Sequence, residues 1–418
     1  MGNRRENAAV TDVSAWPVHV VGMRLIVHII ALILGDFFFS IRGCDHETCS
    51  RDLALFKHRD TISRYLWYNN LMKKHAIIPV FIPHRGCPND CVFCNQKAIT
   101  ARSSDVSPED VRNTIETYLP TLTGRGLETI ELAFFGGSFT GLSIAEQSAF
   151  LTVAKEYKDA GLIDKIHMST RPDYIDRDIL DNLKTYDADI IELGVQSFDP
   201  DVLRASNRGH TVEDVYSACH LIKEYGFTLG IQLMIGLPGD SPAKSIASAK
   251  ETVRLAPQLA RLYPTIVLQD TRLLQMYEEG IYQPLTTEEA VSTTKEMYRI
   301  LSDAGITILR VGLKSTDLIT EGEAVCGHTF HPAFRQLVEG ELAKESLENQ
   351  LLQLLENTKK NQMPAGEFAF RSNGHSFSNM IGNAKRNKLY FAEKYPGIKI
   401  RWKTDPALED GRYTVLKY

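Results

Sequence analysis

From residue 77 onward, short apolar runs rich in β-branched residues alternate with longer segments of helical periodicity. The predicted strands are 77–82, 130–135, 165–169, 190–195, 229–235, 261–268 and 306–311. Predicted helices between them include 108–118, 144–160, 212–225 and 242–255. Strands that alternate with helices of this length form right-handed βαβ units and a parallel sheet, either open or curved into a barrel. Functional residues of such a fold are expected at the carboxyl ends of the strands.

Composition and charge restrict the class of protein. The chain has 418 residues, of which 43% are hydrophobic, enough for one large core or two smaller ones. The net charge of -5 excludes a globally basic surface, so any contact with nucleic acid must come from a local patch. Seven cysteines, three of them within eight positions, do not suit a disulfide framework. We therefore expect a reducing, cytoplasmic environment.

The first 71 residues differ from the rest of the chain. The apolar segment 18–41 is interrupted by Arg24, His28 and Asp36, and its longest uncharged stretch is too short to span a bilayer. We interpret residues 1–71 as an extension ahead of a natural start at Met72, with a weak membrane anchor as the alternative. The predicted domains are then this extension, a barrel over 72–330 and a C-terminal extension over 331–418.

Three cysteines lie close together just after the first predicted strand. Cys87, Cys91 and Cys94 have the spacing C-x3-C-x2-C, with no fourth cysteine nearby. A closed structural metal site usually has four protein ligands, so three thiolates suggest that one coordination position is kept free. The spacing alone also allows a zinc site completed by His84 or by a distant residue.

Polar and glycine-rich segments occur where the predicted strands end. They are FFGGSFTG (134–141), STRPDYI (169–175), ELGVQSFD (192–199) and IGLPGD (235–240), and YPT (263–265) is placed at the start of the sixth strand. The fourth segment lacks the Gly-Lys-Ser/Thr of a phosphate-binding loop. Because these segments would meet at one edge of the sheet, a single cofactor site could include all of them.

The three-cysteine loop after a first strand, with Phe93 before the third cysteine, resembles the cluster-binding motif of the radical S-adenosylmethionine (SAM) superfamily. Within it, STRPDYI, ELGVQS, SNRGHTV (206–212) and YPT resemble the radical domain of the Elongator catalytic subunit and its bacterial relatives, over about residues 76–313. This resemblance implies a partial (βα)6 TIM-like barrel and a four-iron four-sulfur cluster on the three cysteines. It also implies that SAM chelates the open iron and is reductively cleaved to a 5'-deoxyadenosyl radical.

The resemblance also implies roles for residues around the cluster. The implied SAM-binding residues are Phe93, Gly136, Gly137, Ser169, Gln196 and Arg208. The two glycines would leave backbone groups bare for the methionine amino group, and Phe93 would pack beside the adenine or shield the cluster from water. Gln196 and Arg208 would hold the ribose and the carboxylate, the latter through a bidentate pair. Ser138 and Ser169 stand where related families often carry acidic residues.

Other residues keep ordinary interpretations. Glu192 is interpreted as a strand-end charge paired with Arg171 or Arg208, and Gln232 as filling a polar barrel interior. Cys326 is interpreted as a small buried hydrophobe rather than a hydrogen-atom donor. His328 and His331 would either close the barrel or face the substrate.

The substrate is the less constrained part of the prediction. Elongator-like enzymes modify the wobble uridine of transfer RNA (tRNA), so the resemblance implies a tRNA substrate and an electron donor such as ferredoxin or flavodoxin. Acetyl-coenzyme A use is not carried over, because no binding pattern for it is visible after residue 313. The alternatives are small-molecule radical chemistry like that of oxygen-independent coproporphyrinogen oxidases, and a non-catalytic metal-binding protein.

The segment 379–402 gives a hint about substrate class. Its Gly-x-x-Lys loop (382–385), helix, Pro-Gly turn and alternating strand resemble the GxxG element of a KH-type RNA-binding fold. Residues 371–403 hold eight Lys or Arg and one acid, with Tyr390, Phe391 and Trp402 among them. Such a patch would allow phosphate contacts and base stacking, and a plain helix-strand cap on the barrel is the alternative.

Overall fold

The computed structural model describes residues 74–82, 90–95, 106–313, 325–360 and 366–418, all of which belong to one compact unit. The apolar segment 18–41 and the extension 1–71 lie outside the described residues. Among the helices that are described, none combines the length and apolar character needed to cross a membrane.

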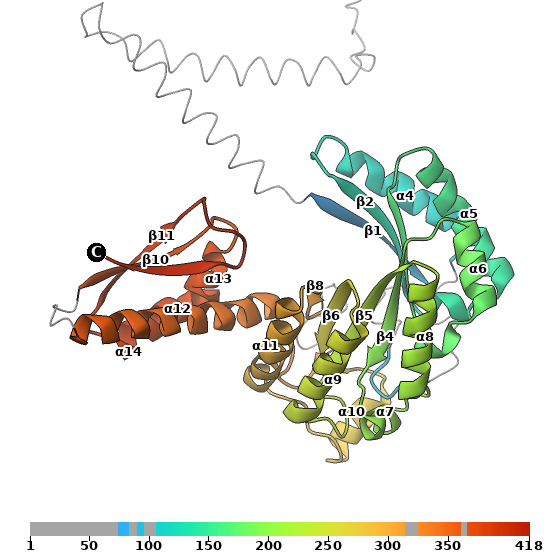
Figure 1. Cartoon of the computed structure of the whole chain (residues 1–418). Coiled ribbons are helices and arrows are strands. Elements are labelled where there is room, and N and C mark those ends of the chain that lie inside the picture. Colours follow the sequence, from blue (N-terminus) through green and yellow to red (C-terminus); the bar gives the residue numbers. More distant parts are fainter. Residues whose placement is uncertain (1–73, 83–89, 96–105, 314–324, 361–365) are drawn as a thin grey trace, which may run out of the picture. The chain divides into compact units, whose positions relative to one another are not determined.

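Seven parallel strands form the main sheet, in the order β1-β2-β3-β4-β5-β6-β8. They are β1 (His75–Ile82), β2 (Thr129–Gly136), β3 (Lys165–Thr170), β4 (Ile190–Gln196), β5 (Thr228–Ile235), β6 (Leu259–Pro264) and β8 (Thr307–Val311). The sheet curves strongly, with β1 and β8 as its two separate edges (Figure 1). The predicted α/β fold, a partial TIM-like barrel, is confirmed.

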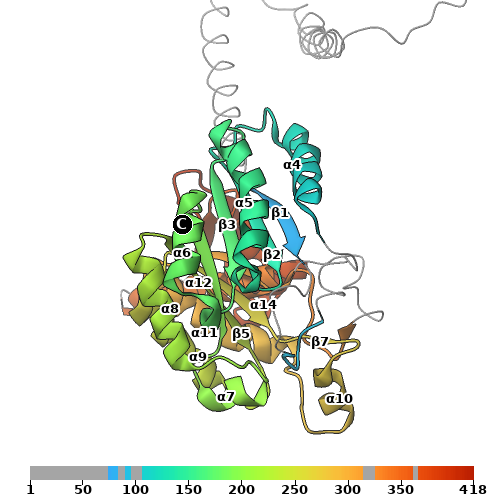
Figure 2. The ribbon, with the colours of Figure 1, turned by 90° about the vertical axis from the view of Figure 1, so that its right-hand side faces the viewer.

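Helices cover the convex side of the curved sheet, and Figure 2 shows α5 and α6 in front of the strands. The helices are α4 (Pro108–Leu122), α5 (Ile144–Asp159), α6 (Arg177–Thr185), α7 (Pro200–Ala205), α8 (Val212–Glu224), α9 (Pro242–Leu255), α10 (Arg272–Glu278) and α11 (Thr287–Asp303), with short 3-10 turns at Phe139–Gly141 and Pro172–Tyr174. Capping boxes of Ser or Thr with Asp or Glu fix the starts of α4, α5, α8 and α11. The main core lies between these helices and the outward strand residues, such as Leu132, Phe134 and Leu193.

The strand predicted over 261–268 is divided. β6 ends at Pro264, and β7 (Val267–Leu268) leaves the main sheet to pair antiparallel with β9 (Val325–Cys326). Proline has no N–H to continue a ladder, which accounts for the break at this point. The YPT segment therefore ends the sixth strand, and the prediction that it begins this strand is wrong. Its correct position is the carboxyl edge, with the other polar segments.

A long helix leads from the barrel into a second, smaller sheet. The elements are α12 (Phe334–Lys360), β10 (Glu367–Ser372), α13 (Phe377–Ile381), a 3-10 turn (Asn383–Lys385), α14 (Arg386–Lys394), β11 (Lys399–Thr404) and β12 (Tyr413–Lys417). The strand order is β11-β10-β12, with β10 parallel to β11 and antiparallel to β12. The glycine loop, helix and strand predicted for 379–402 are thus present in that order.

The aromatic residues of this segment form its core. Phe391 is fully buried, and its ring packs edge-on against Phe370 and Trp402. The Tyr390 hydroxyl donates a hydrogen bond to the Glu348 carboxylate of α12. The prediction that these aromatics serve base stacking is therefore wrong for Phe391, because the small domain needs large side chains to fill its interior.

Candidate cofactor site at the carboxyl ends of the strands

The second half of the cysteine loop is held by two neighbouring connections. The Cys94 N–H donates to the Cys91 carbonyl at 2.9 Å, a tight turn that keeps the two residues close. The Val92 N–H donates to the Ser206 carbonyl, and the Val92 carbonyl accepts from the Leu273 N–H. The loop is thus fixed from both sides at the carboxyl end of the barrel. Cys87 and His84 lie outside the described residues, so the full ligand set stays a prediction.

Arg208 lies directly against the cysteine loop. It is 7% exposed, its Nη1 donates to the Cys91 sulfur at 3.4 Å, and its Nη2 donates to the Gly194 carbonyl at 2.6 Å. Its Nε is buried without a hydrogen-bond partner. A buried, unsatisfied N–H on a charged group is costly, so this atom indicates that an acceptor is missing here. The SAM carboxylate assigned to Arg208 by resemblance is an acceptor of the right charge.

Gln196 ends β4 in an unusual conformation. Its φ is +70°, in the left-handed region that non-glycine residues seldom occupy, and the β4–β5 register shifts between Gly194 and Gln196. The bulge leaves the Gln196 side chain held by Gln232, whose Nε2 donates to Oε1 at 3.0 Å. Gly194 is required there, because a Cβ would lie 2.9 Å from Arg208 Nη2 and 3.1 Å from Gln196 Nε2. Such backbone strain is typical of functional sites.

The glycine segment after β2 is shaped by close backbone approach. Gly136 has φ +106°, and a Cβ on it would lie 2.9 Å from the Ile82 carbonyl oxygen. The Gly137 N–H donates to that oxygen at 2.8 Å. Ser138, where an acidic residue is usual, is buried; its hydroxyl is within 2.9 Å of Thr170 Oγ1 and accepts from the Arg171 N–H. Ser138 therefore ties β2 to β3.

The remaining predicted residues divide between site and scaffold. Phe93 packs with Cys326 against an apolar cluster that includes Val267 and Leu273. Cys326 is only partly buried, and its sulfur accepts from Gln269 Nε2 at 3.4 Å. His331 uses Nδ1 to accept from the Ala333 N–H just ahead of α12, which is a structural role.

The interior of the barrel holds a layer of charge that the sequence reading did not anticipate. Arg261 Nε of β6 donates to Glu192 Oε2 of β4 at 2.5 Å, although one strand, β5, lies between them in the sheet. Gly230 of β5 makes this possible, because a Cβ there would lie 3.2 Å from Glu192 Cγ. The prediction that Glu192 pairs with Arg171 or Arg208 is wrong. Glu192 lies mid-strand, where Arg261 can reach it, while Arg171 pairs with Asp173.

The same layer continues through β3 to β1. His167 is fully buried, with Nδ1 2.5 Å from Glu131 Oε1 and Nε2 3.7 Å from Glu192 Oε2. His75 Nε2 lies 3.1 Å from Glu131 Oε2. Ser169, assigned to SAM by resemblance, donates to Glu192 Oε1 at 3.3 Å. Charged residues at inward positions of otherwise apolar strands were the sequence signal for this layer.

Glu131 should make the stability of the protein depend on pH. Burial alone would raise its pKa, but hydrogen bonds with His167 and His75 outweigh burial and lower it from 4.5 to about 2. A carboxyl group with a depressed pKa contributes stability above its unfolded pKa and loses it as pH falls through the folded pKa. We expect about 3 kcal/mol of the free energy of unfolding to be lost between about pH 5 and pH 2.

Urea unfolding across this pH range tests that expectation. Glu131→Gln should be less stable than the natural chain at neutral pH and should show a flatter acid limb, because the amide does not titrate. Equal acid limbs for the two proteins would contradict the assignment to Glu131.

His210 was also missed by the sequence reading. It is 4% exposed, and burial together with the positive charges of Arg208 and Arg171 lowers its pKa to about 3. The ring is therefore neutral at physiological pH and adds no repulsion beside Arg208. Its place in SNRGHTV, two residues after Arg208, was the available signal.

The residues present fit an iron-sulfur cluster and SAM. Thiolates are the usual ligands of such clusters, and Arg208 adds a donor to the Cys91 sulfur. The unsatisfied Arg208 Nε and the bulge at Gln196 lie at the same edge of the sheet as the glycine segment. These features lie on the carboxyl side of β2 and β4.

Comparison with known proteins points to the same cofactors. The profile of the Radical SAM superfamily matches residues 81–251, and that of the Radical_SAM C-terminal domain matches residues 257–344. A tRNA uridine(34) acetyltransferase from Dehalococcoides mccartyi is 29% identical over 272 residues, covering 55% of this chain and 59% of the relative. Human Elongator complex protein 3 is 26% identical over 297 residues, covering 58% and 54%.

A solved structure shares the fold. The archaeal Elp3 of Methanocaldococcus infernus, lacking its N-terminal 46 residues, superposes with a TM-score of 0.52 at 22% identity, covering 73% of this chain and 67% of that one. The chain spans somewhat more than half the length of the curated relatives it matches. The two profile matches contain the described cysteines, the glycine segment and Arg208. The chain therefore belongs to the radical SAM superfamily, with a four-iron four-sulfur cluster and S-adenosylmethionine as its cofactors.

Proposed function

We propose that this chain uses the radical chemistry of its superfamily to modify tRNA, with a ferredoxin or flavodoxin as electron donor. The observation that carries the proposal is the similarity of its radical domain to proteins named tRNA uridine(34) acetyltransferase, at 29% identity over 272 residues. The contact between Arg208 and the Cys91 sulfur beside the ends of the strands supports it. Acetyl-coenzyme A is not part of the proposal.

Each residue of the site has a physical task in this proposal. When bound, the cluster and SAM supply a strongly oxidising 5'-deoxyadenosyl radical that abstracts hydrogen. Cys91 and Cys94, with Cys87, would hold the cluster. Arg208 would orient the SAM carboxylate through charge-assisted hydrogen bonds, and Gln196 would position the ribose. The adjacent apolar cluster around Phe93 and Val267 would exclude water from the reactive side.

The barrel interior would receive the substrate. Arg261 is 6% exposed, and its Nη2 is buried without a hydrogen-bond partner. Burial lowers the pKa of Arg261, but Glu192 and Tyr263 together raise it more, so the guanidinium stays charged. Its free N–H would suit a carbonyl oxygen of a pyrimidine base. The small-molecule alternative would use the same donor for a carboxylate.

An anaerobic assay tests the proposal. The full chain is reconstituted with iron and sulfide, reduced with dithionite, and supplied with SAM. We expect bulk tRNA to bind and to increase 5'-deoxyadenosine formation several-fold over the uncoupled rate. No binding and no stimulation by tRNA would reject tRNA as the substrate and favour a small molecule.

A further inference from the structure

The small C-terminal sheet packs one face against α12 and carries charged side chains on the other. Phe368 and Phe370 of β10 point into the core beneath α12. Side chains alternate between faces along a strand, and register partners share a face. Glu367, Ala369 and Arg371 therefore point to the opposite side, together with their β11 partners Lys399, Arg401 and Lys403. This opposite side is called the outer face below.

The outer face carries a row of cations. Lys399, Arg401 and Lys403 are all exposed, with 73% of the Lys399 side chain and 48% of the Arg401 side chain accessible to solvent. Alternate residues of a strand repeat every ~6.6 Å, so the three charges form a line. Glu367 pairs with Lys399 and Arg401, and Asp405 pairs with Arg371. Four cations thus face two carboxylates, which leaves an excess of positive charge.

Two exposed side chains with apolar surface, Tyr418 and Leu416, lie beside this row of cations. Tyr418 is 55% exposed, and the Arg401 guanidinium and Lys403 ammonium lie 5.3 Å and 4.9 Å from its ring centroid. Leu416, the β12 partner of Ala369, is 45% exposed. Exposed rings next to cations are the surface on which bases stack while phosphates meet charge. An acidic peptide would use the cations but would gain nothing specific from an exposed aromatic ring.

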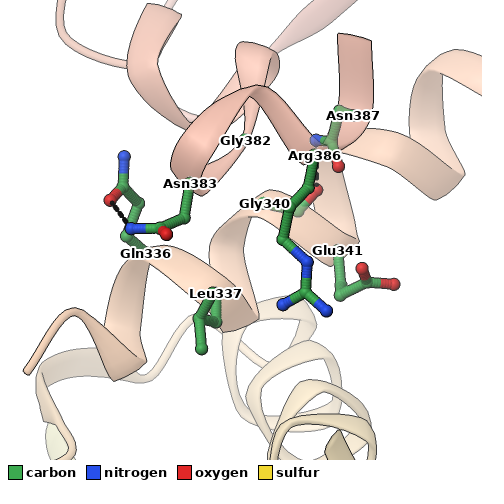
Figure 3. A pocket seen from close by; sticks show the side chains of 8 residues that line it. All are labelled: Gln336, Leu337, Gly340, Glu341, Gly382, Asn383, Arg386 and Asn387. Atoms are coloured by element: carbon green, nitrogen blue, oxygen red, sulfur yellow. Dashed lines mark hydrogen bonds between the residues drawn. The ribbon is translucent and has the colours of Figure 1, made fainter. Parts of the chain in front are cut away.

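The glycine loop is less suited to this task. Figure 3 shows Asn383 turned toward Gln336 of α12, and the Asn387 amide bonded to the Gly340 carbonyl. The cavity between loop and helix measures about 10 Å³, room for one water at most. Gly382 is buried, and a Cβ on it would lie 2.8 Å from the Asn387 backbone nitrogen. Gly382 and Asn383, the first half of the loop, therefore serve to pack the loop against α12.

We propose that the outer face of the β11-β10-β12 sheet binds the phosphate backbone of the tRNA substrate, with Tyr418 and Leu416 beneath unstacked bases. This inference rests on the proposed function and specifies the surface that captures the RNA. β11 is an edge strand of its sheet, so an extended RNA strand can lie along its full length without crossing another strand. The segment after residue 344 lies outside both matched family profiles, so this surface belongs to the part that distinguishes the chain from them.

The test is tRNA binding by the full chain as a function of salt. Lys399→Gln, Arg401→Gln and Lys403→Gln are combined in one sheet variant. Loss of three phosphate contacts should weaken binding at least ~10-fold at low salt and lower the slope of log K against log salt by about 2. Uncoupled SAM cleavage should be unchanged, because none of the three residues belongs to the cofactor site.

Three control variants show whether tRNA binding depends on the positive charge of these residues and on their position. Arg125→Gln, Lys165→Gln and Lys250→Gln remove the same charge from exposed positions outside this sheet and should bind as the natural chain does. Lys399→Arg, Arg401→Lys and Lys403→Arg keep the charge and should retain binding. Glu367→Gln removes the acid that holds two of the cations and should tighten binding, an effect that loss of structure cannot produce.

Each outcome decides between the proposals. If the sheet variant binds tRNA as the natural chain does, or if Glu367→Gln weakens binding, the outer face is not the RNA surface and this inference is overturned. If only a Lys385→Glu, Arg386→Glu loop variant loses binding, the loop expected from the KH-like pattern is the surface instead. If the natural chain binds no tRNA even at low salt, both this inference and the proposed function fail.

Discussion

Serine in place of Cys87, Cys91 or Cys94 is expected to remove the visible absorbance of the cluster and all 5'-deoxyadenosine formation. Iron-sulfur clusters need thiolate ligands, and a serine hydroxyl is a poor substitute at neutral pH. Cys91 is 3% exposed and lies against Arg208, so its replacement also removes the sulfur that accepts the Arg208 Nη1 hydrogen bond. The measurement is absorbance and product analysis after anaerobic reconstitution.

Cys219→Ala is the matched control. Cys219 is 1% exposed on the buried side of α8, where burial raises the pKa of its thiol to about 12. It is therefore a neutral, apolar side chain, and its loss should leave the cluster and the cleavage activity intact. Full activity in all three serine variants would contradict the assignment of the cluster to this loop.

Glu192→Gln is expected to lower the free energy of unfolding by about 3 kcal/mol or more. The substitution leaves the Arg261 guanidinium charged inside the barrel with an amide in place of its carboxylate, and breaking a buried pair typically costs ~3–5 kcal/mol. His167 Nε2, 3.7 Å from the same carboxylate, also loses the charge on that side of its ring. The measurement is urea unfolding of the purified chain followed by circular dichroism.

Two comparisons show whether burial causes this loss. The double variant Glu192→Gln, Arg261→Met removes both charges and should recover more than half of the lost stability. Glu224→Gln breaks an ion pair with Arg177 at the surface, made of two hydrogen bonds, and should cost much less stability than Glu192→Gln, because solvent screens the pair. A cost for Glu192→Gln no larger than that for Glu224→Gln would contradict the description of the interior as a charged layer.

The fold could be predicted from the sequence because its signals are local. Apolar β-branched runs and capped helices alternate regularly, and each predicted strand of the main sheet exists within a few residues. The one misplaced boundary, at YPT, arose because an apolar run continues through Pro264 although the ladder does not. Strand order and the split into β6 and β7 depend on pairing with distant residues such as Cys326, which a local pattern does not encode.

The motifs at the ends of the strands could be predicted from the sequence, but the charged pair inside the barrel could not. The cysteines, the glycine segment and Arg208 occur in recognisable motifs, and the structure brings Cys91 and Arg208 into contact. The Glu192–Arg261 pair joins strands β4 and β6 across Gly230, 69 positions apart in sequence. No spacing rule links such residues. They meet only because parallel strands bring inward positions to the same level of the barrel.

The C-terminal segment shows how composition alone can mislead. The net charge of residues 371–403 leaves out the acids that form ion pairs with these basic residues in the fold. Those acids lie outside this stretch and are Glu367, Glu348, Asp405 and Glu288. Its aromatics were needed for a small core. What remains exposed, the β11 row with Tyr418, is a pattern of alternate strand positions that becomes visible only once the register is known.

Mass spectrometry of tRNA nucleosides tests the central claim most directly. Nucleosides are compared between cells with the gene, cells without it, and cells without it that express the Cys94→Ser chain. We predict that one modified nucleoside is missing from both of the latter and returns only with the natural chain. Identical nucleoside profiles in all three strains would contradict the claim that this radical SAM enzyme modifies tRNA.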